Sequence, residues 1–138
     1  MWHLAKVYCI LVPMIVAIDF LWLGVIMAGF YKSELGPLAR RVGDSLAPVK
    51  WAAIGVWLLI PLGIILFVLP RISASDPYLT GIGWGFLYGV ILYAVYDLTN
   101  YAMLNRWSLR MTFIDILWGG VLCGLGACIA VFLNRYLS

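Results

Sequence analysis

Three aspartates lie inside stretches of sequence that are otherwise almost entirely apolar. Asp19 belongs to IDFLWLG, Asp115 to the similar IDILWGG, and Asp97 to YDLTNYA, which also contains Asn100. Burying an ionised carboxylate at the centre of a membrane helix costs about 2.5 to 3.5 kcal/mol, and such acids commonly mark proton relays, ion pathways or the counter-ion of a ligand. These residues could therefore bind a proton, a cation or a cationic group away from water.

No basic residue accompanies these acids. The four longest apolar runs, residues 7–30, 51–69, 79–104 and 112–133, contain no lysine, arginine or histidine. Burial disfavours the ionised form of a carboxyl group, and a second carboxyl group nearby disfavours it further. We therefore expect that at least one of the three aspartates is protonated at neutral pH, or that a bound cation or cationic group neutralises them.

Aromatic and polar neighbours extend the candidate site. Trp22 follows Asp19 by three residues, which places both on one helix face, and Trp118 stands in the same relation to its own acid. A buried indole usually has a partner for its ring N–H. We expect two tryptophans and a tyrosine to form the walls of the site, with acids and other polar side chains as its ligands. The candidate binding residues are Asp19, Asp97, Asn100, Asp115, Tyr93, Trp22, Trp118 and Thr99.

Each acid taken alone also has a structural explanation. Asp97 and its polar neighbours could form hydrogen bonds between helices, at about 0.6 kcal/mol per bond. Thr112 and Asp115 have the spacing of a capping box, and the helix dipole favours a carboxylate in the first turn. Asp19 lies eleven residues before the end of the first run, about 16 Å along a helix axis, which is too deep for a helix cap.

The elements that position these residues are the four apolar runs. The chain has 138 residues, of which 65% are hydrophobic and 11% are charged. A helix of about 20 apolar residues crosses the hydrocarbon core of a bilayer, whereas membrane strands are about ten residues long and alternate in character. The sequence therefore predicts an all-α integral membrane four-helix bundle, built as a single transmembrane domain over residues 1–138.

Small residues follow one face of the third run and one face of the fourth. In the third run a glycine recurs every four residues, and the series ends in an aromatic residue and an acid: Gly81, Gly85, Gly89, Tyr93 and Asp97. The fourth run has Asp115, Gly119 and Cys123 at the same interval. Small residues allow helix backbones to approach closely. We therefore expect the third and fourth spans to pack tightly and to bring their two acids into the contact.

The longest loop joins the first two runs and contains a helical pattern. Its apolar residues recur at helical spacing, at Leu35, Leu38, Val42 and Leu46. Pro37 is placed where proline is favoured at a helix start, and Pro48 is placed to end the helix. These features predict a short interfacial amphipathic helix in the first loop, with a partly ordered polar loop as the alternative.

Basic residues are unequally distributed between the two ends of the bundle. The first and third loops hold six of them, Lys32, Arg40, Arg41, Lys50, Arg106 and Arg110, and the opposite end holds Lys6, Arg71 and Arg135. Positively charged loops face the cytoplasm, so we expect both termini on the other side of the membrane. The net charge of +3 is explained by these flanks, and no nucleic-acid partner is predicted.

Two parts of the sequence resemble a known family. YAVYDLTNYAMLNRW, followed by DILWG in the fourth run, is similar to a bacterial family of small four-span membrane proteins catalogued as domain of unknown function 2177. LGPL in the first loop, Pro70 at the end of the second run and the acid of the first run extend the likeness. The resemblance implies four helices in a bacterial inner membrane and implies no particular reaction. In such a membrane, the distribution of basic residues would put both termini in the periplasm.

The leading functional hypothesis is a bundle with a polar pocket open toward the cytoplasmic half of the membrane. The pocket would bind a proton, a small cation or an amphiphile, which the protein would transport or sense. Four short helices are few for alternating access, so a transporter of this size is expected to work as a homodimer. Membrane lipids are expected partners.

The alternatives are a membrane-embedded lipid-handling enzyme or accessory subunit, and a structural helper without chemistry. An enzyme would use paired carboxylates as acid and base. The sequence combines no nucleophile with a base and an orienting group, so no catalytic residue is predicted. The cysteines, Cys9, Cys123 and Cys128, lie in apolar runs without CxxC spacing and are read as packing residues. No metal site is predicted: three carboxylates and an amide suit a hard cation such as Mg²⁺ or Ca²⁺, but sites for these ions are usually wetter. No cofactor is predicted, because the ligands of haem and iron–sulfur clusters are missing.

Overall fold

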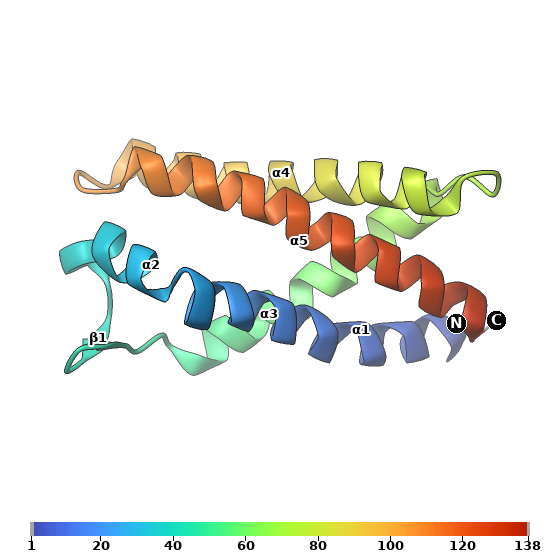
Figure 1. Cartoon of the computed structure of the whole chain (residues 1–138), viewed down its shortest axis with the longest axis horizontal. Coiled ribbons are helices and arrows are strands. Elements are labelled where there is room, and N and C mark those ends of the chain that lie inside the picture. The colour runs from blue at the N-terminus through green and yellow to red at the C-terminus, as the bar shows by residue number, and fades with distance from the viewer. Residues whose placement is uncertain (1, 138) are drawn as a thin grey trace.

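The computed structural model describes residues 2–137, which are mostly helical (Figure 1). Its long helices are interrupted by short turns with tighter or wider helical geometry. In chain order, the elements are α1 (Trp2–Leu21), a π-helical turn (Trp22–Ile26), α2 (Ala28–Leu35), a 3₁₀ turn (Gly36–Leu38), β1 (Arg41–Val42), β2 (Ser45–Leu46), α3 (Lys50–Gly63), a π-helical segment (Ile64–Val68), a 3₁₀ turn (Leu69–Arg71), α4 (Pro77–Met103) and α5 (Leu109–Tyr136).

Four helical segments are long and apolar enough to cross a membrane, which confirms the predicted all-α fold. They are Trp2–Ile26, Lys50–Arg71, Pro77–Met103 and Leu109–Tyr136. The first span ends at Ile26 rather than at residue 30, because the backbone leaves helical geometry at Met27, whose N–H bonds the carbonyl oxygen of Trp22. Asp19 therefore lies seven residues from the end of its span, about 10 Å along the axis instead of the expected 16 Å.

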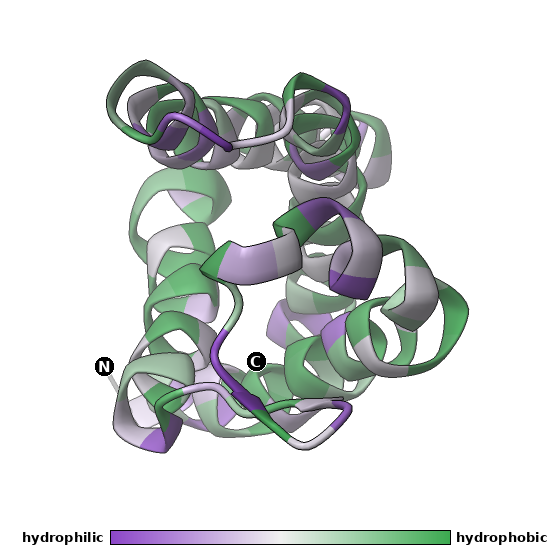
Figure 2. Ribbon diagram, turned by 90° about the vertical axis from the view of Figure 1, so that its left-hand side faces the viewer, coloured by the Kyte–Doolittle hydropathy of each residue, from purple (hydrophilic) through white to green (hydrophobic). Residues whose placement is uncertain are grey.

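The spans run antiparallel, so the molecule has two distinct ends. Both termini and the turn between α3 and α4 lie at one end, and the first and third loops lie at the other (Figure 1). Seen from the end with the two loops, the hydrophilic residues gather in the connecting segments, and the helix walls are mainly apolar (Figure 2). This arrangement suits a bundle whose sides face lipid tails and whose ends face headgroups.

The core lies where the first, second and fourth spans meet. Leu11, Ile15, Ile64 and Leu122 are fully buried there and belong to one contiguous apolar cluster. Gly126 makes room for two of these side chains, because a Cβ atom at that position would lie 2.7 Å from Ile15 Cδ1 and 2.8 Å from Ile64 Cδ1. The fourth span is thus the central helix of the cluster.

The third and fourth spans pack through their glycines, as the spacing predicted. A Cβ atom added at Gly89 would lie 1.9 Å from the carbonyl oxygen of Gly119, and one added at Gly85 would lie 2.5 Å from that of Cys123. Both distances are far below van der Waals contact, so only glycine fits at these positions. The two backbones touch along this face, and Asp97 is fully buried two turns beyond Gly89.

The first loop differs from its prediction. No helix forms between Pro37 and Pro48; the segment makes a 3₁₀ turn followed by the antiparallel hairpin of β1 and β2, and the short helix of this loop is α2, which ends at Leu35. The predicted position of the interfacial amphipathic helix is therefore wrong. Its apolar residues Val42 and Leu46 are exposed on the hairpin instead.

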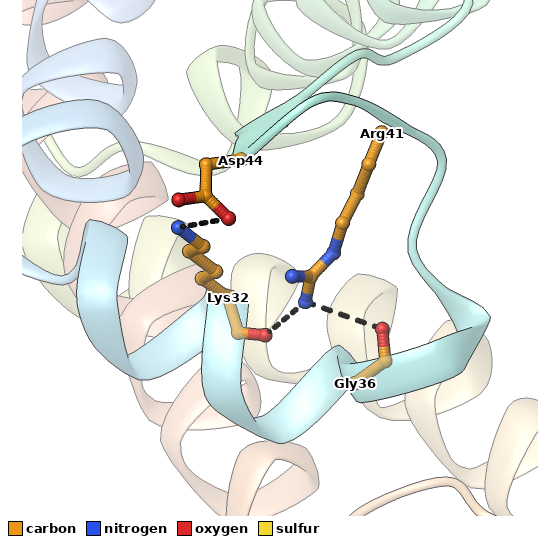
Figure 3. Close-up of polar contacts among 4 residues, drawn as sticks. All are labelled: Lys32, Gly36, Arg41 and Asp44. Atoms are coloured by element: carbon orange, nitrogen blue, oxygen red, sulfur yellow. Dashed lines mark hydrogen bonds and ion pairs between the residues drawn. The ribbon is translucent and has the colours of Figure 1, made fainter.

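Two glycines and one arginine explain this difference. Gly36 and Gly43 adopt positive φ angles of 47° and 59°, a conformation that ends helices and opens two-residue hairpin turns. The Arg41 guanidinium then donates to the carbonyl oxygens of Lys32 and Gly36, at 2.6 and 3.2 Å, and Lys32 pairs with Asp44 at 3.6 Å (Figure 3). Arg41 thereby satisfies carbonyl groups that the end of α2 would otherwise leave without a partner.

Candidate functional site

Asp19 connects three of the four spans. Its side chain is 3% exposed, and each carboxylate oxygen accepts a hydrogen bond from an indole. Trp57 Nε1 of α3 donates to Oδ2 at 2.9 Å, and Trp118 Nε1 of α5 donates to Oδ1 at 3.0 Å. A buried acid is stabilised by such donors. Asp19 is therefore fixed by its neighbours rather than exposed in an open cavity.

The two tryptophans predicted to line the site pack against each other. The rings of Trp22 and Trp118 stack with centroids 4.3 Å apart and planes 5° apart. Trp22 lies in the π-helical turn at the end of the first span, and its Nε1 donates to the hydroxyl of Tyr31 at 3.1 Å. Both indole N–H groups donate hydrogen bonds within the protein, so neither is available to a ligand on this side of the site.

Tyr31 links the stack to the second acid. Its hydroxyl accepts from Trp22 and donates to Asp115 Oδ1, and the residue is 5% exposed at the start of α2. Burial raises the pKa of Tyr31 above its usual range, and the neighbouring carboxyl group of Asp115 raises it further. Tyr31 therefore keeps its proton and remains a hydrogen-bond donor to Asp115.

Asp97 is the acid with the weakest hydrogen bonding. It is fully buried, and among the described residues neither carboxylate oxygen makes a hydrogen bond of normal geometry, although Trp107 and Asp115 lie close enough to interact with it. The amide nitrogen of Asn100, nearly one turn further along α4, is also buried without a bond of normal geometry. Asp97 lies close enough to interact electrostatically with Asp115, which in turn interacts with Asp19. The structure thus brings the three predicted acids together in series, at the end of the bundle that carries the first and third loops.

The two remaining predicted site residues differ in position. The ring of Tyr93 packs on Gly119, and Tyr93 interacts electrostatically with both Asp19 and Asp115, so it belongs to the cluster. Thr99 is exposed, and its hydroxyl donates to the carbonyl oxygen of Val95 on the same helix at 2.6 Å. Thr99 therefore faces away from the acids.

The capping explanation for Asp115 is wrong. α5 begins at Leu109, and its N-cap is Ser108, whose Oγ accepts from the backbone N–H of Met111 at 3.1 Å. Asp115 lies six residues beyond the start of the helix, out of reach of its free N–H groups. Thr112 instead accepts from Trp107 Nε1 at 3.2 Å. Asp115 is thus free to interact with Tyr31 and Asp97.

The Ser108 cap also joins the two loops beside the acids. Its hydroxyl donates to Glu34 of α2, and Glu34 pairs with Arg110 at 3.7 Å. We expect Ser108→Ala to lower the free energy of unfolding by about 1 kcal/mol, the usual cost of losing an N-cap. Thermal unfolding in detergent, followed by circular dichroism, measures this. Ser33→Ala, at an exposed position of α2, is the matched control and should change stability by less than about 0.5 kcal/mol; equal losses would contradict the cap.

The sequence matches one protein family over nearly its whole length. Residues 4–132 match the family described as predicted membrane protein (DUF2177). The chain belongs to this family. No curated protein and no solved structure matches it. The family assignment agrees with the four spans, and the family description names no activity.

Two residues of this DUF2177 site were not predicted from the sequence. Trp57 and Tyr31 each contact an acid that is distant along the chain, at separations of 38 and 84 residues. The signal for Tyr31 was its place directly after the first apolar run, where a polar aromatic residue can turn back into the bundle. Trp57 had no local signal, because only the rotation of α3 about its axis directs the indole toward Asp19.

The donor set of this family member suits hydrogen bonding more than metal binding. Over residues 2–137, no group of three or more histidine, cysteine, aspartate or glutamate side chains is arranged to hold a metal ion. A pocket lies at the opposite end, around the turn between α3 and α4. What the acids form is a compact network of carboxyl, indole and phenol groups, with Asp97 at its edge.

Proposed function

We propose that this protein binds a proton at the pair formed by the buried Asp97 and the partly buried Asp115, and senses or transports protons through it. The observation that carries the proposal is the environment of Asp97. Its carboxyl group is shielded from solvent and accepts no hydrogen bond of normal geometry, and an ionised carboxylate in such surroundings is very costly. Two adjacent carboxyl groups that share one proton avoid most of this cost.

The neighbouring contacts favour a proton over a larger ligand. Both oxygens of Asp19 accept from tryptophans, and Asp115 accepts from Tyr31. The stack of Trp22 on Trp118 fills the space that an amphiphile would need. A proton requires no cavity, whereas a cation requires several oxygen ligands around it. Among the ligands first considered, the proton therefore fits these contacts best.

The polar residues around the acids suggest how the proton would reach them. Asn100 follows Asp97 toward the third loop, with its amide nitrogen also buried. Glu34, Ser108 and Arg110 lie at the same end, between α2 and the start of α5. Small rearrangements of α2 would alter both this cluster and the Tyr31 bond to Asp115. We propose that exchange occurs from this end, and that this end faces the cytoplasm of a bacterial inner membrane with both termini periplasmic. The excess of basic residues in the two loops supports this orientation.

The test is the protonation state of the carboxyl groups in purified protein in lipid. A protonated carboxylic acid has an infrared carbonyl band that shifts in D₂O. We expect such a band at neutral pH, lost in Asp97→Asn and altered in Asp115→Asn, because asparagine keeps the shape of the neutral acid. Asp76→Asn, at an exposed position of the opposite end, is the control and should leave the band unchanged. Absence of the band in the wild type, or its persistence in Asp97→Asn, would contradict the proposal.

A second measurement separates binding from transport. Proteoliposomes with an internal pH dye report whether an imposed pH gradient decays faster with the protein than without it. Faster decay that is reduced at least tenfold in Asp97→Asn supports transport. An unchanged gradient together with the infrared band supports proton sensing. The expected homodimer stays a prediction, which chemical crosslinking in the same liposomes would test.

A further inference from the structure

A pocket lies at the end of the bundle opposite to the acids. It has a volume of about 340 Å³ and is formed by the end of the second span, the turn that follows it, the first residue of α4 and the last turns of α5. Its lining residues are Leu69, Ile72, Ser73, Ala74, Pro77, Val131, Asn134 and Arg135. Three span ends meet here, beside the two termini (Figure 1). The pocket is therefore at the depth of lipid headgroups.

The pocket combines one cationic group with neutral polar and apolar surfaces. Arg135 is exposed, and no acidic side chain among residues 2–137 forms an ion pair with it. Ser73 and Asn134 add a hydroxyl and an amide, while Leu69, Ile72 and Val131 form the apolar part. This combination suits a ligand that has an anionic group at one end and an apolar group at the other.

A second source of positive potential lies beside the pocket. Pro77 lines the pocket and is the first residue of the 27-residue helix α4. The N-terminus of a long helix carries a partial positive charge and favours anions, phosphates in particular. Asp76 precedes this helix but does not line the pocket, so the lining residues themselves carry only positive charge.

We propose that this pocket binds the headgroup of an anionic phospholipid. Arg135 pairs with the phosphate, Ser73 bonds to its oxygens or to the glycerol, and the apolar residues contact the first carbons of the acyl chains. Both the charge and the position at the span ends fit this occupant. The inference is independent of the proton site, which lies at the other end of the bundle.

Lipid titration of delipidated protein, followed by native mass spectrometry, tests the proposal. Phosphatidylglycerol is expected to bind more tightly than phosphatidylcholine, and Arg135→Gln should weaken phosphatidylglycerol binding about tenfold, which corresponds to about 1.4 kcal/mol. Arg71→Gln is the matched control: Arg71 lies at the same end, but its guanidinium donates to the Phe67 carbonyl oxygen and lies 5.8 Å from the centre of the Trp84 ring. The Arg71→Gln variant should bind phosphatidylglycerol as tightly as the wild type does.

Other outcomes overturn the assignment. Equal affinity for the two lipids, or equal loss in both arginine variants, would mean that the pocket does not recognise an anionic headgroup. Inorganic phosphate and glycerol phosphate form a separate arm of the experiment. If either competes with phosphatidylglycerol at comparable concentration, the site recognises a free phosphate and the lipid assignment fails. Circular dichroism of both variants verifies that the exposed substitutions leave the fold intact.

Discussion

Gly89→Ala is expected to destabilise the protein by about 3 kcal/mol or more, at the upper end of what overpacking costs. The added Cβ atom would lie 1.9 Å from the carbonyl oxygen of Gly119 and 2.5 Å from its carbonyl carbon. These atoms belong to the backbone of α5, which cannot move aside as a flexible side chain would. The two helices must separate along their shared face, and the close packing on either side of Gly89 is lost with them.

Gly83→Ala supplies the control for this prediction. Gly83 lies on the same helix, and a Cβ atom added there would meet nothing within 4 Å. Because alanine is the better helix former by about 1 kcal/mol, this variant should be as stable as the wild type or slightly more stable. Unfolding in increasing mole fractions of sodium dodecyl sulfate, followed by circular dichroism, compares the two. If both variants lose the same stability, the backbone contact between α4 and α5 does not hold the bundle together.

The packing of Gly89 could be predicted from the sequence because its signal is local. A glycine every four residues marks one face of a helix, and a similar series on the next helix supplies the partner. The short turn between them forces the two helices to run side by side. The same reasoning placed Asp97 and Asp115 near each other, and the structure agrees.

The contacts of Asp19 could not be predicted in the same way. Its partners Trp57 and Trp118 come from two other spans, and which residue of a span faces inward depends on how all four helices rotate and tilt. The first span also ends earlier than predicted, at Ile26. This places Asp19 nearer the headgroups and brings Tyr31 back into the bundle. Nothing in the local pattern of the first run marks the π-helical turn that makes this possible.

The helix predicted in the first loop was wrong for a related reason. Apolar residues at helical spacing predicted a helix there, but the positive φ angles of Gly36 and Gly43 decide the backbone. Glycine is compatible with many conformations, so its presence in a sequence does not say which one is used. The Arg41 bonds to the end of α2 select the hairpin, and such bonds become visible only once the chain is folded.

Asp19→Ala is the second large effect that the structure predicts. The substitution leaves the indole N–H groups of Trp57 and Trp118 without an acceptor, and each buried donor left without a partner costs about 1 to 3 kcal/mol. We expect a loss of about 3 kcal/mol in the same unfolding assay. Asp19→Asn should lose about half as much, because its amide oxygen can accept from one indole while its NH₂ group faces the other.

Asp19→Ala made in a variant that lacks both indole donors shows whether the lost stability comes from the indole hydrogen bonds. In the double variant Trp57→Phe with Trp118→Phe, Asp19 becomes a buried acid with nothing to bond, which is itself destabilising. Asp19→Ala should then be neutral or stabilising, so the destabilisation seen in the wild-type background should disappear or reverse its sign. If the alanine variant costs as much in both backgrounds, the indole bonds do not stabilise the bundle, and Asp19 must act through a contact other than these. A reversal would show that a carboxyl group deep in the bundle is tolerated because two tryptophans from neighbouring spans bond it.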